Sequence, residues 1–183
     1  PTAGTHFSLY FFSAVYRLIH HLRRHDGVKK EDPTERYPFL DAYFGEMLAY
    51  LPSELTWRQG LGWWQHQITN WESAVEVHLP LLALPDLAFE HRLALVFAGL
   101  VEEDSRFGTV LARLQAPLPQ RRPGLELVAH VLAGDAALDP WRLCRPLLEA
   151  GLVTAANKDD PRSEWVLQVS SLMWDVVRGE TAP

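Results

Sequence analysis

The segment 140–169 constrains the fold more than any other part of this chain. The pair Asp139-Pro140 supplies a helix cap and a residue suited to the first helical turn, and leucines then recur at helical spacing. Gly151 supplies the left-handed residue that ends such a helix. A strand begins at 152–153 and, after a polar loop, a second strand returns at 165–169. The segment therefore predicts a helix followed by a β-hairpin.

A helix followed by a two-stranded wing is typical of winged-helix domains, which bind DNA or dock other proteins and are rarely enzymes. The rest of the chain is predicted to be mostly helical, because apolar residues recur every three or four positions in several segments. We predict a mainly α fold, in which a helical bundle is followed by a winged-helix-like half with a small C-terminal β-hairpin. The expected helices are 6–24, 39–51, 71–79, 86–101, 105–115, 124–132 and 140–150.

The chain is divided into two parts at residue 69. The run Thr69-Asn70-Trp71-Glu72 has the spacing of a capping box, in which a hydroxyl and a carboxylate satisfy backbone amides at a helix start. The preceding stretch, 55–68, contains Gly60 and Gly62 and is predicted to be a broken helix. Residues 1–68 are therefore expected to form a helical lead-in subdomain, and residues 69–183 the winged-helix-like domain.

The composition predicts a hydrophobic core and opposes a dedicated nucleic-acid binder. Of the 183 residues, 48% are hydrophobic and 7 are tryptophans, which excludes wholesale disorder. The formal net charge is −6, whereas proteins that neutralise nucleic-acid phosphates usually carry the opposite balance. Cys144 is the single cysteine, which excludes an internal disulfide and a cysteine-built zinc site and is expected of a cytoplasmic protein.

No membrane span or signal peptide is predicted near the N-terminus. Segment 7–22 is apolar, but Ser8, Ser13 and Arg17 interrupt it, and it is shorter than the roughly 20 residues that span a bilayer. No basic segment precedes it. The chain begins with a proline and ends in a loose polar run, 178–183, so we interpret both ends as cut from a longer polypeptide.

Three groups of chemically capable residues each have a plainer structural explanation. His21 and His25 have a possible metal spacing, but two arginines lie between them and no glutamate takes the protease position. Consecutive carboxylates in 102–104 point in different directions, and Cys144 is placed to pack as a small core residue. The sequence contains neither a P-loop nor a Gly-x-Ser-x-Gly elbow. We therefore expect a protein that is not an enzyme, with no catalytic, cofactor-binding or metal-binding residue.

The tryptophans and arginines supply the candidate partner-binding residues. Trp71, Trp165 and Trp174 occur at periodic positions and are expected in the core. The other four, including Trp57, lie near glycines or a helix start, where an indole is often partly exposed. Exposed aromatic residues and arginines are enriched in protein-contact hot spots. The candidate partner-binding residues are Trp63, Trp64, Trp141, Arg142, Arg145 and Arg162.

From Trp71 to Gly179 the chain resembles the N-terminal region of bacterial AAA+ ATPases, including those associated with extracellular contractile injection systems. The matching motifs are Trp71-Glu72, Leu114-Gln115, Arg121-Arg122-Pro123, Trp141-Arg142 and Leu147-Leu148. The resemblance implies a winged-helix-like, non-catalytic module that docks protein substrates, adaptors or assembly partners. It also implies an ATPase motor in cis, outside this chain, through which the module would oligomerise.

The alternative is a DNA-binding transcription regulator, because 148–153, 159–162 and 166–169 are also similar to the wing of MarR-type proteins. In that family the wing arginine, here Arg162, can enter the minor groove. A recognition helix needs small polar and basic residues at its exposed N-terminal end, whereas 140–150 offers one tryptophan and two arginines among leucines. That composition suits packing better than base contacts, so nucleic acid is the less favoured partner.

Two further expectations follow from these patterns. Leu127 and Leu148 lie on the apolar stripes of their helices and are expected to be buried. In a docking module the three arginines of the candidate set would be dispersed or paired with the acidic residues of 159–164. In a DNA-binding regulator they would form one continuous positive face.

Overall fold

The computed structural model describes residues 2–25, 32–74, 80–84, 86–134 and 136–180. Within these ranges the fold is mainly helical, with one short 3-10 turn and one two-stranded sheet, as the sequence predicted. Positions 75–79 of the predicted helix 71–79 lie outside the described residues. The elements are α1 (Ala3–His25), α2 (Pro33–Arg36), α3 (Phe39–Leu48), α4 (Trp57–Ala74), α5 (Pro80–Ala83), α6 (Phe89–Ala98), α7 (Leu100–Glu103), α8 (Phe107–Leu114), α9 (Leu125–Ala133), α10 (Pro140–Glu149), β1 (Thr154–Ala155), η1 (Arg162–Glu164), β2 (Leu167–Gln168) and α11 (Ser171–Arg178).

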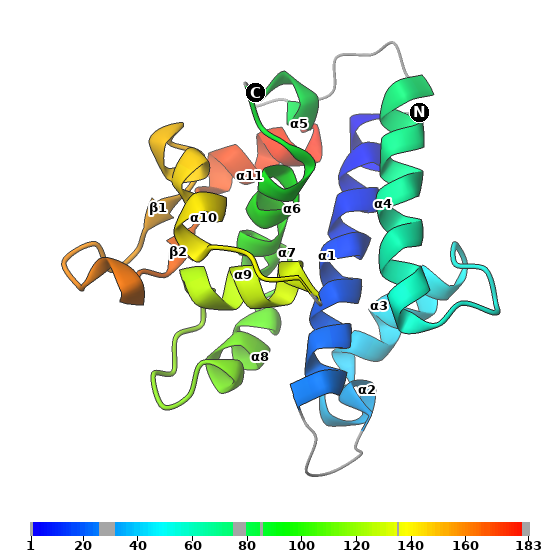
Figure 1. Cartoon of the computed structure of the whole chain (residues 1–183), viewed down its shortest axis with the longest axis horizontal. Helices are drawn as coiled ribbons and strands as arrows, with labels where there is room; N and C mark the ends of the chain where they lie inside the picture. The colour runs from blue at the N-terminus through cyan, green and yellow to red at the C-terminus, as the bar shows by residue number, and fades with distance from the viewer. Residues whose placement is uncertain (1, 26–31, 75–79, 85, 135, 181–183) are drawn as a thin grey trace.

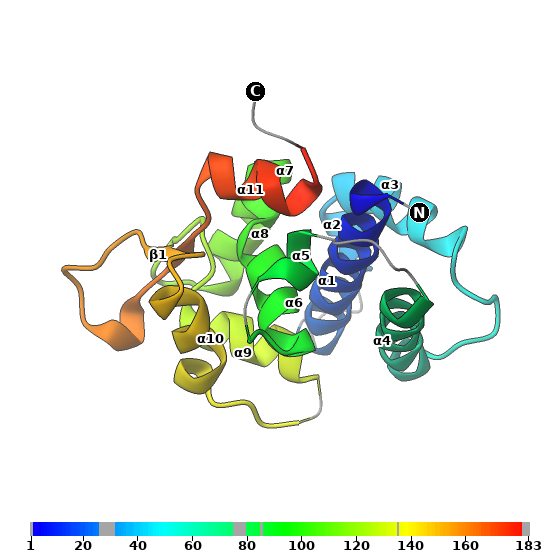
Figure 2. The same ribbon diagram turned by 90° about the horizontal axis from the view of Figure 1, so that it is seen from above.

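The central element is α1, which lies between α4 and α6 in both views of the molecule (Figures 1 and 2). Every residue from Tyr10 to Tyr16 is buried, so the burial extends around the helix instead of following one stripe. A helix surrounded in this way must be apolar on all sides, which explains the apolar character of 7–22. No helix in the described parts of the chain is long and apolar enough to cross a membrane.

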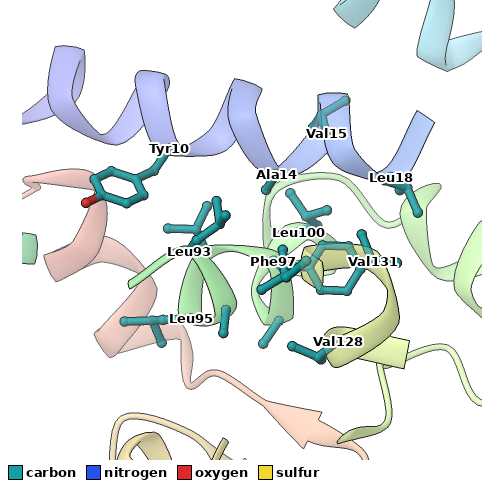
Figure 3. Packing of buried hydrophobic residues seen from close by; sticks show 14 of the residues in the cluster. Tyr10, Ala14, Val15, Leu18, Leu93, Leu95, Phe97, Leu100, Val128 and Val131 are labelled. Carbon is teal, nitrogen blue, oxygen red and sulfur yellow. The ribbon is translucent and has the colours of Figure 1, made fainter. Parts of the chain in front are cut away.

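The core joins α1 to the helices that follow α5. Ala14 and Leu18 of α1 point toward Phe97 of α6 and Val131 of α9, with Leu93 and Val128 in the same cluster (Figure 3). Its fully buried residues include Tyr10, Leu18, Phe97 and Leu100. The cluster is continuous across the molecule and includes residues from both sides of position 69.

The predicted helix start at Thr69 is wrong, and so is the predicted break in 55–68. Helix α4 continues through both places, and the Thr69 hydroxyl donates to the Gln65 carbonyl oxygen at 2.9 Å instead of capping a helix. Gly60 lies within this helix, and the Tyr16 phenol packs where a Cβ at this position would stand. The proposed boundary between residues 68 and 69 therefore falls inside a helix.

The helix expected at 86–101 is two helices, α6 and α7, which meet at Gly99. The Trp174 indole packs against Gly99 so closely that a Cβ there would overlap the ring. The indole Nε1 also donates to Glu103 Oε2 at 3.0 Å, which fixes α11 against α7. Helix α11 ends at Gly179, which is in the left-handed region with φ of 80°.

The predicted hairpin is confirmed, and its register pairs Thr154 with Gln168 and Ala155 with Leu167 in antiparallel fashion. Its first strand begins two residues later than predicted, since 152–153 form a buried bend before β1. Segment 152–169 is called the wing below. It projects at the opposite side of the molecule from α4 (Figures 1 and 2).

Leu127 is buried, as predicted, but the expectation for Leu148 is wrong. Leu148 is only half-buried, while its neighbour Leu147 is fully buried. Residues 147 and 148 are consecutive and cannot both face the core on a helix with 3.6 residues per turn. Helix α10 packs with Leu143, Cys144 and Leu147 inward.

Candidate docking site

The predicted residues Trp141 and Arg162 lie together, where η1 in the loop of the wing meets the start of α10. The Arg162 guanidinium carbon is 4.2 Å from the centre of the Trp141 ring, in a cation–π contact. Trp141 is held near the start of α10, where Asp139 Oδ1 accepts a hydrogen bond from the Arg142 amide at 2.8 Å. Trp141 is half-buried and Arg162 is exposed, so the pair is accessible from outside.

The loop of the wing is fixed by Asn157, a residue of the polar loop that was predicted between the two strands. The Asn157 Nδ2 donates to Asp160 Oδ2 at 2.8 Å and to the Glu164 carbonyl oxygen at 3.0 Å. Its Oδ1 accepts from the Val166 amide at 2.8 Å. The one sequence signal for this role of Asn157 was the tendency of asparagine side chains in turns to hydrogen-bond the nearby backbone. These bonds position η1, and with it Arg162.

Trp165 supports the same face. Its ring lies 6.4 Å from that of Trp141 in an edge-to-face arrangement, and its Nε1 donates to the Asp160 carbonyl oxygen at 3.0 Å. The prediction that Trp165 belongs to the core is wrong, because it is only half-buried, and the same holds for Trp71. Trp174, predicted in the same group, is buried.

The other two tryptophans of the candidate set lie on α4, at the opposite side of α1 from the wing (Figure 1). The prediction that Trp64 is an exposed contact residue is wrong, because it is fully buried. Its ring centre is 6.2 Å from that of Phe12. Trp63 is half-buried and packs edge-to-face on Trp64 at 4.9 Å. The structure therefore does not bring this pair to the site at the wing.

The two arginines of α10 are both exposed and differ in their contacts. Arg145 Nε is 2.6 Å from Glu149 Oε1, one helical turn along. Arg142 has no side-chain partner among the described residues. With Arg162 on the Trp141 ring, the three arginines do not make the predicted pairs with the acidic residues of 159–164. They also do not stand together as one group of unpaired cations.

A recess of about 500 Å³ opens beside the Trp141–Arg162 pair. A second cleft, of about 570 Å³, adjoins it and shares Leu125, Glu126 and Ser163 with it. The two clefts border each other at these three residues, and the pair of clefts is called the wing groove below. Its lining residues are His21, His25, Leu114, Gln115, Ala116, Leu118, Gln120, Gly124, Leu125, Glu126, Leu127, His130, Asp139, Pro140, Trp141, Arg162, Ser163, Glu164 and Val166.

The wing groove combines apolar and acidic side chains. Leu125 and Val166 are buried beneath it, while Leu118 is 53% exposed at its edge. Glu126 on α9 and Glu164 on η1 are exposed. Neither carboxylate has a hydrogen bond or an ion pair with any side chain in the described parts of the chain. Sequence reasoning missed Glu126, because an isolated glutamate carries no local signal of what surrounds it. It named Glu164 only as a possible partner of the arginines, and Glu164 makes no such pair among the described residues.

Histidines line the far end of the wing groove. The rings of His21 and His25 are 4.1 Å apart, and His130 lies on the same cleft. Burial, together with the nearby positive charges of His25 and His130, lowers the pKa of His21 to about 4. The structure thus brings together the two histidines with possible metal spacing. No group of three or more His, Cys, Asp or Glu side chains in the described ranges is placed to hold a metal ion.

A second polar cluster, called the core cluster below, lies between α1, α4 and α6. The Tyr10 hydroxyl donates to Glu72 Oε1 at 2.7 Å, and His6 Nε2 is 2.8 Å from the same oxygen. Arg92 Nε donates to the Tyr10 oxygen at 2.9 Å, and its NH2 is 3.6 Å from Glu72 Oε2. Burial opposes ionisation of Glu72, but the bonds from His6 and Tyr10 and the charge of Arg92 lower its pKa overall. Each of these side chains is paired within the fold.

Cys144 is fully buried, in agreement with its interpretation as a packed small residue. Burial raises the pKa of its thiol to about 12, so the thiol stays protonated at neutral pH.

Comparison with protein-family models, with curated proteins and with solved structures found no match to this chain.

Proposed function

We propose that this chain is a non-catalytic docking module that binds a protein partner along the wing groove. The observation that supports it is the accessible Trp141–Arg162 pair at the mouth of a groove with an apolar floor. Tryptophan and arginine are the residues most enriched in interface hot spots, and such anchors usually lie beside well-defined pockets. The contact with Arg162 holds the indole in one orientation before a partner binds, which reduces the ordering cost of association.

The charges along the wing favour a protein partner over DNA. A wing that enters the minor groove needs an arginine whose side chain projects freely from it, but the Arg162 guanidinium lies on the Trp141 ring. Glu126 and Glu164 place two negative charges in the wing groove beside it. Both negative charges would repel the phosphate backbone of DNA, and neutralisation of that backbone supplies much of the affinity for duplex DNA.

The resemblance to AAA+ N-terminal regions extends the proposal to the setting of the module. In this extended proposal, the wing groove binds substrates, adaptors or assembly partners for an ATPase motor. The motor lies outside this chain, and the protein works in a bacterial cytoplasm. Arg121-Arg122-Pro123 is the most specific of the motifs that carry the resemblance. Trp141 belongs to another of them and contacts Arg162 beside the wing groove.

Selection of phage-displayed random peptides on the immobilised chain tests the docking function. We expect enriched peptides whose affinity falls by at least about tenfold for Trp141→Ala, because truncation of a hot-spot tryptophan costs about 2 kcal/mol or more. Tyr50→Ala is the matched control, since Tyr50 is 57% exposed but belongs to the opposite half of the molecule.

The same protein is titrated with random duplex DNA across a salt series. The docking proposal predicts weak DNA binding even at low salt. Two results would contradict it: a failure to enrich any peptide, or micromolar duplex binding at physiological salt that Arg162→Ala abolishes. The second result would favour the transcription-regulator alternative.

A further inference from the structure

We infer that the wing groove recognises a basic, apolar peptide segment, in which a leucine-like side chain is accompanied by a lysine or arginine. The inference depends on the proposed docking function and names the chemistry of the partner at that same site. It follows from three features of the groove: an exposed leucine, two carboxylates without partners, and one cation that is already in contact with a ring.

The apolar part of the recognition is provided by Leu118 at the edge of the groove and Leu125 beneath it. Leu118 is 53% exposed although it borders a cleft of about 570 Å³. A side chain placed in this cleft would remove Leu118 from water, at a gain of about 25 cal/mol for each Å² of apolar surface buried. An apolar residue of the partner therefore fits this part of the groove.

The basic part of the recognition is provided by Glu126 and Glu164. These carboxylates come from α9 and η1, two elements that contact each other, and both line the same cleft. Neither has a partner among the described side chains. Asp139, the third acid of the groove, already accepts the hydrogen bond that caps α10. A lysine or arginine of the partner would make charge-assisted hydrogen bonds to the two glutamates.

The other charged groups of the groove do not replace such a cation. Arg162 lies over Trp141, on the side of the groove away from the histidines. His21, His25 and His130 line the far end, with His20 and Arg24 on the pocket next to them. An acidic segment would be repelled by Glu126 and Glu164 and would give neither carboxylate a partner of opposite charge. Charge complementarity therefore selects a basic occupant.

Two fluorescent synthetic peptides of equal length test the inference directly. Both contain the same leucines, which are interspersed with lysines in one peptide and with glutamates in the other, and binding is followed by fluorescence anisotropy at low and at physiological salt. We expect the lysine peptide to bind at least about tenfold more tightly than the glutamate peptide. We also expect about tenfold weaker binding of the lysine peptide to Glu126→Gln/Glu164→Gln, since hydrogen bonds to charged groups are worth about 1.5–3 kcal/mol.

The double variant Glu46→Gln/Glu54→Gln is the matched control. It removes the same charge from exposed positions outside the groove, so it corrects for a general attraction of the lysine peptide to an acidic protein. If both double variants lose the same affinity, the inference is wrong. If peptide binding depends on Trp141 but not on Glu126 and Glu164, the inference is wrong while the docking function stands. If neither peptide binds, the inference is also wrong, and the docking function is decided by the display selection alone.

Discussion

The core cluster and the wing groove contain the same kinds of side chain in opposite states. In the core cluster, Glu72 has the Tyr10 hydroxyl at 2.7 Å, His6 at 2.8 Å and Arg92 at 3.6 Å. In the wing groove, Glu126 and Glu164 have no partner among the described side chains. A carboxylate that joins three helices serves the fold, whereas two carboxylates at the edge of an apolar groove remain available to a partner. The predictions below test this distinction.

Loss of the central carboxylate of the core cluster should have the largest effect. Glu72→Ala removes the partner of three side chains and leaves His6, which is 1% exposed, without its hydrogen bond. Breaking a buried pair from one side costs about 3–5 kcal/mol of unfolding free energy, and we expect a value in that range from urea denaturation. Glu46→Ala, on the exposed face of α3, should change the value by less than about 0.5 kcal/mol. Equal losses for the two variants would show that the core cluster does not hold the helices together.

Lowering the pH should reduce the free energy of unfolding through His21, at the far end of the wing groove. Its pKa is about 4 in the folded chain against 6.5 for a free histidine, so the unfolded state takes up a proton first as the pH falls. The neutral ring therefore makes its full contribution to the free energy of unfolding above pH 6.5. This contribution is lost progressively down to about pH 4, by a total of up to about 3 kcal/mol.

The check is the pH dependence of urea unfolding for the wild type and His21→Leu. The variant should lose less stability than the wild type between neutral pH and pH 4.5. His66→Leu, at an exposed position of α4, should follow the wild type. A His21→Leu curve parallel to that of the wild type would mean that this histidine is not held neutral by its surroundings.

Two glycines of α4 should respond in opposite directions to the same change. A Cβ at Gly60 would overlap the Tyr16 phenol, so Gly60→Ala should cost about 1–3 kcal/mol of unfolding free energy. A Cβ at Gly62 meets nothing within 4 Å, so Gly62→Ala should stabilise the helix by about 0.5–1 kcal/mol. Thermal unfolding of both variants gives the sign of each effect. Destabilisation of equal size at both positions would contradict a continuous α4 packed on α1.

Local signals predicted much of the fold. Asp139 accepts a backbone hydrogen bond at the start of α10, and Gly151 follows that helix in the left-handed region, with φ of 70°, because caps and stops depend only on neighbouring residues. The capping-box pattern at Thr69 failed because α4 continues through it, packed on α1 by residues such as Trp64. Tertiary packing thus overrode a local signal, and no pattern within α4 reports what lies against it.

The site was predicted less completely than the fold. Trp141 and Arg162 were both named in advance, since tryptophan and arginine favour contact surfaces, but their contact joins positions twenty-one residues apart and could not be derived from spacing. Trp64 was named for the glycines near it, and the same glycine-rich stretch lets α1 approach and bury it. Glu126 was missed, and Glu164 was named only as a possible partner of the arginines, because the absence of a partner is a property of the folded surface.

The most direct test of the distinction between the two clusters is the unfolding free energy of Glu126→Gln/Glu164→Gln in urea. We predict a value within about 0.5 kcal/mol of the wild type, or slightly above it, because neither carboxylate has a partner in the fold and the substitution removes two negative charges. A loss of more than about 1.5 kcal/mol would contradict the account, since it would show that these carboxylates stabilise the fold as Glu72 does.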